Sequence, residues 1–250
     1  MERLEQLTQI LKRLNSGDDP TRVKEEAKGF LATIDAKDLS IAEQNLIDEG
    51  LATSDLQRLC SIHLELLKDH VEKMKSQLPP GHVVSTLVSE HESILSFLDT
   101  LEKVNKAIQK MDSYNAEGKD FRKLAHIAEH LVAAELHHQR EEEILFPELE
   151  RRGVHGPPMI MRQEHSLLRE YKQQLKQLAE DAAQIDFSEF RQQLEKVVGF
   201  IIPTLREHIF KENNILYPTA LQVIEDQSIW EKLKAECDKI GYCCFTPQNK

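Results

Sequence analysis

Two four-residue steps from histidine to glutamate stand out in the second half of the chain. His137 is followed by Glu141, and His208 is followed by Glu212. Residues i and i+4 lie one above the other on the same face of a helix, so each pair presents an imidazole and a carboxylate to one point. Imidazole and carboxylate together suit iron, manganese or zinc. The spacing therefore predicts metal ligands on two helices.

The stretches around these pairs repeat along the chain. The first pair is followed by Ile-Leu-Phe-Pro and the second by Ile-Leu-Tyr-Pro, which end ten residues after each histidine, at Pro147 and Pro218. A Glu-His dipeptide also precedes each pair, at His91 and at His165. Such repetition indicates a duplicated structural unit. The predicted site has six residues: His91, His137, Glu141, His165, His208 and Glu212.

A second register is open at the first pair, because His138 and Glu142 are also four residues apart. The repeat decides between the two registers. His137, and not His138, stands ten residues before the proline, as His208 does in the second copy. We therefore take His137 and its partner Glu141 as the ligands.

The six side chains suffice for two metal ions. If both glutamates bridge, four imidazoles and four carboxylate oxygens supply eight contacts, four to each metal. A solvent-derived bridge adds a fifth ligand, and an octahedral iron keeps one open position. Ferritin-like bundles use Glu-x-x-His on two helices and further glutamates on the others. The reversed order here predicts a histidine-rich two-metal site.

Long helices must position these residues. Nine glycines and 6% aromatic residues in 250, with long stretches of Ala, Leu, Glu, Lys and Gln, favour helix over sheet. The sequence predicts an all-α fold, with a four-helix up-down bundle over residues 82–220. The expected helices are 83–111, 120–150, 157–184 and 188–220, with a shorter one at 225–240.

The chain before the bundle is predicted to form a small helical domain over residues 1–77. Pro20 suits the first position of a helix, Ser40 begins a capping box, and Ser54 can cap a helix running toward Met74. A Leu-Pro-Pro-Gly stretch then breaks the chain. We divide the chain into three parts: 1–77, 82–220 and a helix with a cysteine-bearing tail at 225–250.

Composition excludes several classes of protein. A net charge of −11 opposes binding to a phosphate backbone, so we expect no nucleic acid partner. No apolar run reaches the roughly 18 residues that a membrane span needs, and the N-terminus does not read as a signal peptide. We therefore expect a cytoplasmic protein. Four cysteines do not form a disulfide framework, and Cys60, Cys243 and Cys244 are either packed thiols or groups for metal or redox chemistry.

Residues 82–220 resemble a hemerythrin-like (HHE cation-binding) domain. His137-x-x-x-Glu141 with Leu-Phe-Pro, and His208-x-x-x-Glu212-Asn-Asn with Leu-Tyr-Pro, carry the resemblance. The resemblance implies that the six residues bind two non-haem iron ions and that the two glutamates bridge them; zinc and manganese are compatible with the same ligands. The pattern is most similar to the branch that repairs damaged iron–sulfur centres under nitrosative or oxidative stress.

The resemblance also marks a difference and a second domain. Oxygen-carrying hemerythrins have a further histidine one helical turn away on the third helix, where this sequence has Met161 and Arg169. That difference favours a four-histidine centre. Residues 1–77 resemble a short helical domain of unknown function that often precedes hemerythrin-like domains.

Three functions are compatible with these residues. One is a di-iron protein that binds or handles dioxygen, nitric oxide or iron in stress response or sensing, with iron–sulfur centre repair as one form. Another is a di-iron oxidoreductase acting on nitric oxide, dioxygen or peroxide, and the third is a redox-sensing regulator acting through the N-terminal domain. The expected partners are small diatomic ligands or peroxide, and an iron–sulfur or signalling protein. No general acid or base is identified, so enzyme status stays open.

Overall fold

The structure of the chain is a computed structural model. It describes residues 2–15, 18–31, 78–79, 81–116 and 118–247, with the single positions 38, 42, 45, 46 and 49. Every regular element among the described residues is helical, which confirms the all-α prediction. None of these helices is both long enough and apolar enough to cross a membrane. The helices predicted to start at Ser40 and Ser54, and the thiol of Cys60, lie outside the described residues.

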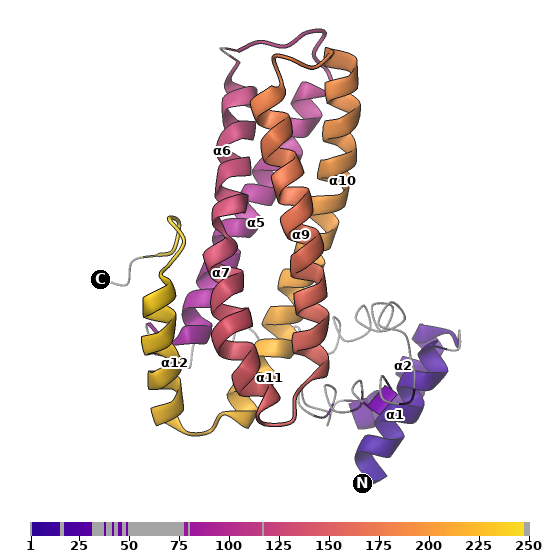
Figure 1. Ribbon diagram of the computed structural model, residues 1–250. Helices are drawn as coiled ribbons and strands as arrows, with labels where there is room; N and C mark the ends of the chain where they lie inside the picture. Colours follow the sequence, from indigo (N-terminus) through magenta and orange to yellow (C-terminus); the bar gives the residue numbers. More distant parts are fainter. Residues whose placement is uncertain are drawn as a thin grey trace.

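Four long helices form the bundle (Figure 1). They are α5 (Val83–Ile108), α6 (Lys119–Ala133), α9 (Gly156–Asp181) and α10 (Phe187–Lys211). Helix α5 contacts α6, α6 contacts α9, α9 contacts α10, and α10 returns to α5, so the four close into a square. Because consecutive helices are neighbours, the chain runs up and down, as the sequence predicts.

Both helices that carry a His–Glu pair change type at the glutamate. The segments η1 (Glu141–Leu145) and η2 (Glu212–Leu216) are π-helical. In each, the residue after the segment donates its N–H to the carbonyl of the first glutamate, five residues back. Pro147 and Pro218 follow at once; a proline has no N–H and crowds the carbonyl four residues before it, so the wider turn accommodates it.

The predicted helices at 120–150 and 188–220 are therefore not single α-helices. The first is divided into α6, α7 (Glu135–Arg140), η1 and α8 (Phe146–Glu150). The second is divided into α10, η2 and α11 (Tyr217–Val223). The expectation of unbroken helices was wrong at Glu141 and Glu212, because the repeated Ile-Leu-aromatic-Pro stretch widens each helix there. The first helix has a further break at Ala134, before its His–Glu pair.

The N-terminal segment contributes two described helices, α1 (Glu2–Asn15) and α2 (Pro20–Leu31). They contact one another and bury Leu7, Leu11 and Val23. Proline at the first position of α2 agrees with the predicted helix start.

The predicted C-terminal helix is α12 (Gln227–Ile240), which contacts α5, α7 and η1 (Figure 1). Asp226 caps its start by accepting a hydrogen bond from the Ser228 N–H. Trp230 fixes the helix to the bundle, because its indole N–H donates to the Ile224 carbonyl at 2.9 Å and its ring lies 4.5 Å from that of His82.

The bundle has two apolar cores with a polar layer between them. One core includes Leu98, Leu101 and Phe190, and the other includes Leu87 and Phe146. On each long helix the buried histidines lie where the chain passes from one core to the other. A buried polar layer is tolerated only where its groups find partners, so the contacts within this layer define the site.

Candidate metal centre

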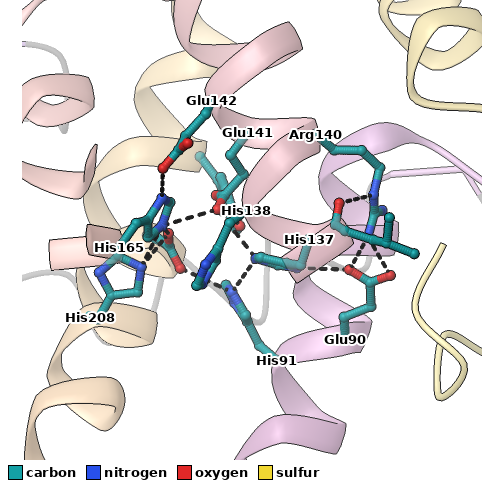
Figure 2. Close-up of polar contacts among 12 residues, drawn as sticks. Glu90, His91, His137, His138, Arg140, Glu141, Glu142, His165 and His208 are labelled. Carbon is teal, nitrogen blue, oxygen red and sulfur yellow. Dashed lines mark hydrogen bonds and ion pairs between the residues drawn. The ribbon is translucent and has the colours of Figure 1, made fainter. Parts of the chain in front are cut away.

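The six predicted residues come together in this polar layer. Figure 2 labels five of them, all except Glu212. None of the six is more than 1% exposed. The histidines come from four different helices, and the glutamates begin the two π-helical segments. The positions are His91 on α5, His137 on α7, Glu141 in η1, His165 on α9, His208 on α10 and Glu212 in η2.

The four histidines form two facing pairs. The Nε2 atoms of His91 and His137 lie 3.1 Å apart, and those of His165 and His208 lie 2.9 Å apart. Each pair joins a lone histidine to the histidine of a His–Glu pair in the same half of the bundle. The repeat in the sequence therefore corresponds to two equivalent pairs in space.

Glu212 lies between the two histidine pairs. One of its oxygens is 2.8 Å from Nε2 of His208, and the other is 3.0 Å from Nε2 of His91. The carboxylate thus turns one oxygen toward each pair, which is the arrangement that a bridging ligand needs.

Glu141 reaches both pairs as well. Its Oε2 lies 3.4 Å from Nε2 of His137 and 3.5 Å from Nε2 of His165. Its Oε1 accepts a hydrogen bond from the hydroxyl of Tyr217 at 2.8 Å. The tyrosine therefore fixes one oxygen and leaves the other between the histidines.

Carboxylates from neighbouring helices hold the Nδ1 atoms of His137 and His208, the histidines of the two His–Glu pairs. His137 Nδ1 is 2.7 Å from Glu90 (Figure 2). His208 Nδ1 is 2.8 Å from Glu164. A carboxylate on one ring nitrogen sets the tautomer and orients the other nitrogen toward a metal. Glu90 and Glu164 thus contact the Nδ1 atoms of these two histidines, and they aim the Nε2 atoms toward the centre.

Each of these carboxylates is in turn held by a cation three residues after the histidine it supports. Arg140 donates to both oxygens of Glu90 at 2.6 Å, and Lys211 pairs with Glu164. Burial raises the pKa of Glu90, but the His137 bond and the Arg140 charge outweigh it and hold that pKa at about 2. The supporting carboxylate is therefore ionised at neutral pH.

The lone histidines are held across the centre by the residues that follow Glu141 and Glu212. His91 Nδ1 lies 2.8 Å from Oδ1 of Asn213, and His165 Nδ1 lies 2.7 Å from Glu142. Arg169 donates to the other oxygen of Glu142 at 2.9 Å. Every Nδ1 of the four predicted ligands thus has an oxygen acceptor, and each Nε2 is left facing inward.

This arrangement fits metal ions. With the proton of each imidazole on Nδ1, two Nε2 lone pairs face one another in each pair, and they repel unless a cation lies between them. Burial and the negative charge of Glu212 raise the pKa of Glu141 well above its usual range. The Oε2 atoms of both glutamates are buried and make no hydrogen bond within the described part of the chain. Metal ions would supply the missing partner for all these atoms.

Comparison with known families agrees with the geometry. The model of the hemerythrin HHE cation-binding domain matches residues 82–220, which hold all six positions. The chain belongs to this family. A family of unknown function, DUF438, matches residues 7–73, so both resemblances seen in the sequence are confirmed. No curated protein matches the chain. The match and the clustered His and Glu ligands make this a metal-binding protein.

The hemerythrin-like centre includes one more buried histidine than we predicted. The ring of His138 stacks on that of His165, with centroids 3.9 Å apart, and one of its nitrogens lies within 4.8 Å of ligand atoms of both His165 and His208. Its Nε2 accepts a hydrogen bond from Nζ of Lys172 at 3.4 Å. In the sequence, the second i, i+4 pair, His138 with Glu142, was the signal for this histidine. No sequence pattern pointed to Lys172, which lies two turns after His165.

The tail after α12 touches the hemerythrin-like centre through Glu90. The hydroxyl of Thr246 donates to this carboxylate, and Sγ of Cys243 lies 4.0 Å from the Arg140 guanidinium. Burial raises the pKa of Cys243 to about 12 and that of Cys237 to about 11. These two thiols are therefore protonated at neutral pH and packed. This supports the interpretation of Cys243 as a packed thiol over a role in redox chemistry.

Proposed function

We propose that the chain is a non-haem di-iron protein that binds dioxygen or nitric oxide, or handles iron, in a cytoplasmic response to oxidative or nitrosative stress. The observation that carries this proposal is the pair of facing histidine pairs with two carboxylates between them. Each glutamate reaches both pairs, so the residues suit two ions that share ligands rather than two separate sites.

The donor set favours iron over zinc. Structural zinc sites are usually tetrahedral and closed. Here four imidazoles and two carboxylates would hold two ions that share ligands, which is unlike a closed tetrahedral site. Imidazole with carboxylate suits iron that changes its oxidation state, and iron would supply the affinity for diatomic ligands.

The side chains of this chain orient and enclose the ions. Glu90 and Glu164 aim the paired histidines, and Tyr217 fixes one oxygen of Glu141. The two apolar cores lie on either side of the polar layer and exclude bulk water. A low-dielectric surrounding strengthens each of these polar contacts.

The proposal extends to the setting of the protein. The three described cysteines are free thiols, as expected in a reducing compartment. The resemblance to the branch that repairs iron–sulfur centres supports a damaged iron–sulfur protein as the partner. Transfer of iron to an apo iron–sulfur protein, in the presence of added inorganic sulfide and a thiol reductant and measured by recovery of its cluster, tests this partner.

Metal content tests the proposal directly. Protein purified without oxygen should hold two irons per chain, and exposure to air should produce the absorption spectrum of an oxo-bridged ferric pair. Nitric oxide should change that spectrum at stoichiometric concentration. Zinc alone, or no stoichiometric metal after reconstitution with iron, would contradict a di-iron function.

A further inference from the structure

The chain continues past α12 and turns back against the bundle. Gly241, which has a φ of 95°, ends the helix, and residues 241–247 then lie beside α5, α6 and α7 (Figure 1). We call residues 241–247 the strap. They lie beyond residue 220, where the hemerythrin-like domain ends. The contacts of the strap are therefore a feature of this chain and have to be explained from its own residues.

An aromatic side chain anchors the strap to two helices of the bundle. The ring of Phe245 lies 5.4 Å from that of Phe97 on α5 and 6.2 Å from that of His130 on α6. The rings of Phe97 and His130 are themselves 5.1 Å apart. Phe245 also packs against the core that includes Leu98. Aromatic contacts of this kind stabilise a segment in one position, so the strap is seated on the bundle.

Two further side chains of the strap contact the buried guanidinium of Arg140. The ring of Tyr242 lies 4.8 Å from the guanidinium carbon, which is within the range of a cation–π interaction. Sγ of Cys243 lies 4.0 Å from the same group, and this residue is 4% exposed. The strap thus helps to keep water away from the charge that holds Glu90, and a drier surrounding strengthens that ion pair.

Thr246 contacts Glu90 itself. Its hydroxyl donates to Oε1 of this carboxylate, and the other oxygen, Oε2, lies 2.7 Å from Nδ1 of His137. Arg140 donates to both oxygens (Figure 2). The N–H of Thr246 donates to the carbonyl of Cys243 at 2.9 Å, which fixes the turn of the strap. Rotation of the Glu90 carboxylate would break its bond with Thr246, so the hydroxyl keeps Oε2 aimed at His137.

We propose that the strap is part of the metal centre and that Thr246 is a positioning residue for the metal held by His91 and His137. The contacts run from the Thr246 hydroxyl through Glu90 to Nδ1 of His137, whose Nε2 faces His91. The strap thereby slows the loss of metal from this position. The inference rests on the proposed di-iron function, because it assigns the strap to one of the two metal positions.

Release of iron to an excess of chelator, from protein loaded with two irons, tests the inference. Thr246→Val keeps the shape of the side chain and removes its hydroxyl, and Phe245→Ala removes the anchor of the strap. Each should speed the release of one iron about three- to tenfold and leave the other within about twofold, as expected when a charged acceptor that orients a ligand loses a hydrogen bond. Thr246→Ser keeps the hydroxyl and should restore the wild-type rate.

Two double variants identify the half of the bundle on which the strap acts. Glu164→Gln removes the carboxylate that orients His208 on the other side. Combined with Thr246→Val, it should speed the release of both irons, because the two changes act on different positions. Glu90→Gln combined with Thr246→Val should release iron within about twofold of Glu90→Gln alone, since both changes act through His137.

Cys244→Ser provides the matched control, because Cys244 is an exposed residue of the same strap. It should leave the release of both irons at the wild-type rate. A difference between Cys244→Ser and Thr246→Val separates the hydroxyl contact with Glu90 from any general effect of changing the strap.

Four results would overturn the inference. They are wild-type release of both irons in Thr246→Val, no recovery in Thr246→Ser, an equal acceleration of both irons in Thr246→Val, and a full effect of Thr246→Val in the Glu90→Gln background. Each is measured against wild-type protein that holds two irons. Absence of iron from the reconstituted wild type would instead refute the proposed function, so the two failures are distinguishable.

Discussion

In each half of the bundle, a glutamate on one helix accepts a hydrogen bond from the histidine of the next and is held by a cation three residues after that histidine. The glutamates are Glu90 and Glu164, and the cations are Arg140 and Lys211. The two cations differ in what else surrounds them. This difference shows which parts of a duplicated site are fixed by geometry and which are free to vary.

The first half is the more enclosed of the two. Arg140 is 1% exposed, and its carboxylate Glu90 also accepts a hydrogen bond from Thr246 of the tail. In the second half Lys211 pairs with the half-exposed Glu207 at 3.5 Å in addition to Glu164. We expect the first half to tolerate the loss of its carboxylate less well, because its cation has no second carboxylate in an ion pair among the described residues.

The largest effect should come from Glu141 and Glu212, the glutamates that are predicted to bridge the two halves. Glu141→Ala and Glu212→Ala should each lose at least half of the bound metal, because each carboxylate lies between both histidine pairs. Iron per chain after reconstitution is the measurement. Equal losses would show that the bridges serve the two halves alike.

The exposed Glu143 provides the matched control, since it lies in the same π-helical segment as Glu141. Glu143→Ala should keep the full metal content. Two irons retained in both bridging variants would mean that these carboxylates are not ligands.

Glu90→Gln and Glu164→Gln test the supporting carboxylates. Each should lower metal affinity about 10–100-fold, because the histidine loses the acceptor that orients it. In metal-free protein, Glu90→Gln should also lower the free energy of unfolding by about 3–5 kcal/mol, since it leaves Arg140 buried without a counter-charge. Glu164→Gln should cost less, because Lys211 keeps Glu207.

Competition with a chelator measures the affinity, and urea unfolding measures the stability. Glu92→Gln, at an exposed position on α5, controls for the loss of a carboxylate. A larger destabilisation in Glu164→Gln than in Glu90→Gln would reverse the comparison of the two halves.

The bundle and its six converging residues could be predicted because both depend on spacing along single helices. The i, i+4 steps define one face, and the repeat aligns His91 with His165. The roles of Glu90 and Glu164 could not be predicted in this way. Each points about 100° away from the adjacent histidine, and only the packing of the helices shows that it reaches the histidine of the next helix.

The differences between the two halves of the bundle could not be predicted from the sequence either. Tyr217 and Phe146 match in the repeat, and the sequence alone treats both as core aromatics. The hydroxyl of Tyr217 finds Glu141 only because η1 and η2 lie side by side in space at the polar layer. Similarly, the sequence alone suggests that Lys172 faces solvent. Only the packing of α9 against α7 shows that it contacts His138.

Tyr217→Phe would make the two halves alike at this position. It removes the hydrogen bond that Oε1 of Glu141 accepts, so metal-free protein should lose about 1–2 kcal/mol of unfolding free energy. Urea unfolding measures this loss. Tyr171→Phe, the same deletion on a half-buried tyrosine that stacks on Phe200, should have a smaller effect. Equal losses in the two variants would remove the special role of the Tyr217 hydroxyl.

The smallest effect is expected where Glu142 stands opposite a neutral counterpart, Asn213. Partial burial raises the pKa of Glu142, but its bonds with His165 and Arg169 outweigh this and lower the pKa to about 2. A depressed pKa in the folded state stabilises the protein above the unfolded pKa of about 4.3, and this contribution is lost as the pH falls toward 2. Glu142→Asn should therefore be less stable than the wild type at pH 7, by about 0.5–1 kcal/mol for a partly exposed ion pair.

The sign of the pH dependence is the sharper test. The difference in stability between the wild type and Glu142→Asn should shrink as metal-free protein is taken from about pH 5 to about pH 2, because Glu142 gains a proton in that window. Thermal unfolding at a series of pH values measures it, with Glu143→Asn as the exposed control. A difference that stays constant with pH would mean that the carboxylate of Glu142 is not ionised against His165 and Arg169. Its role would then be the neutral acceptor role that Asn213 has in the other half.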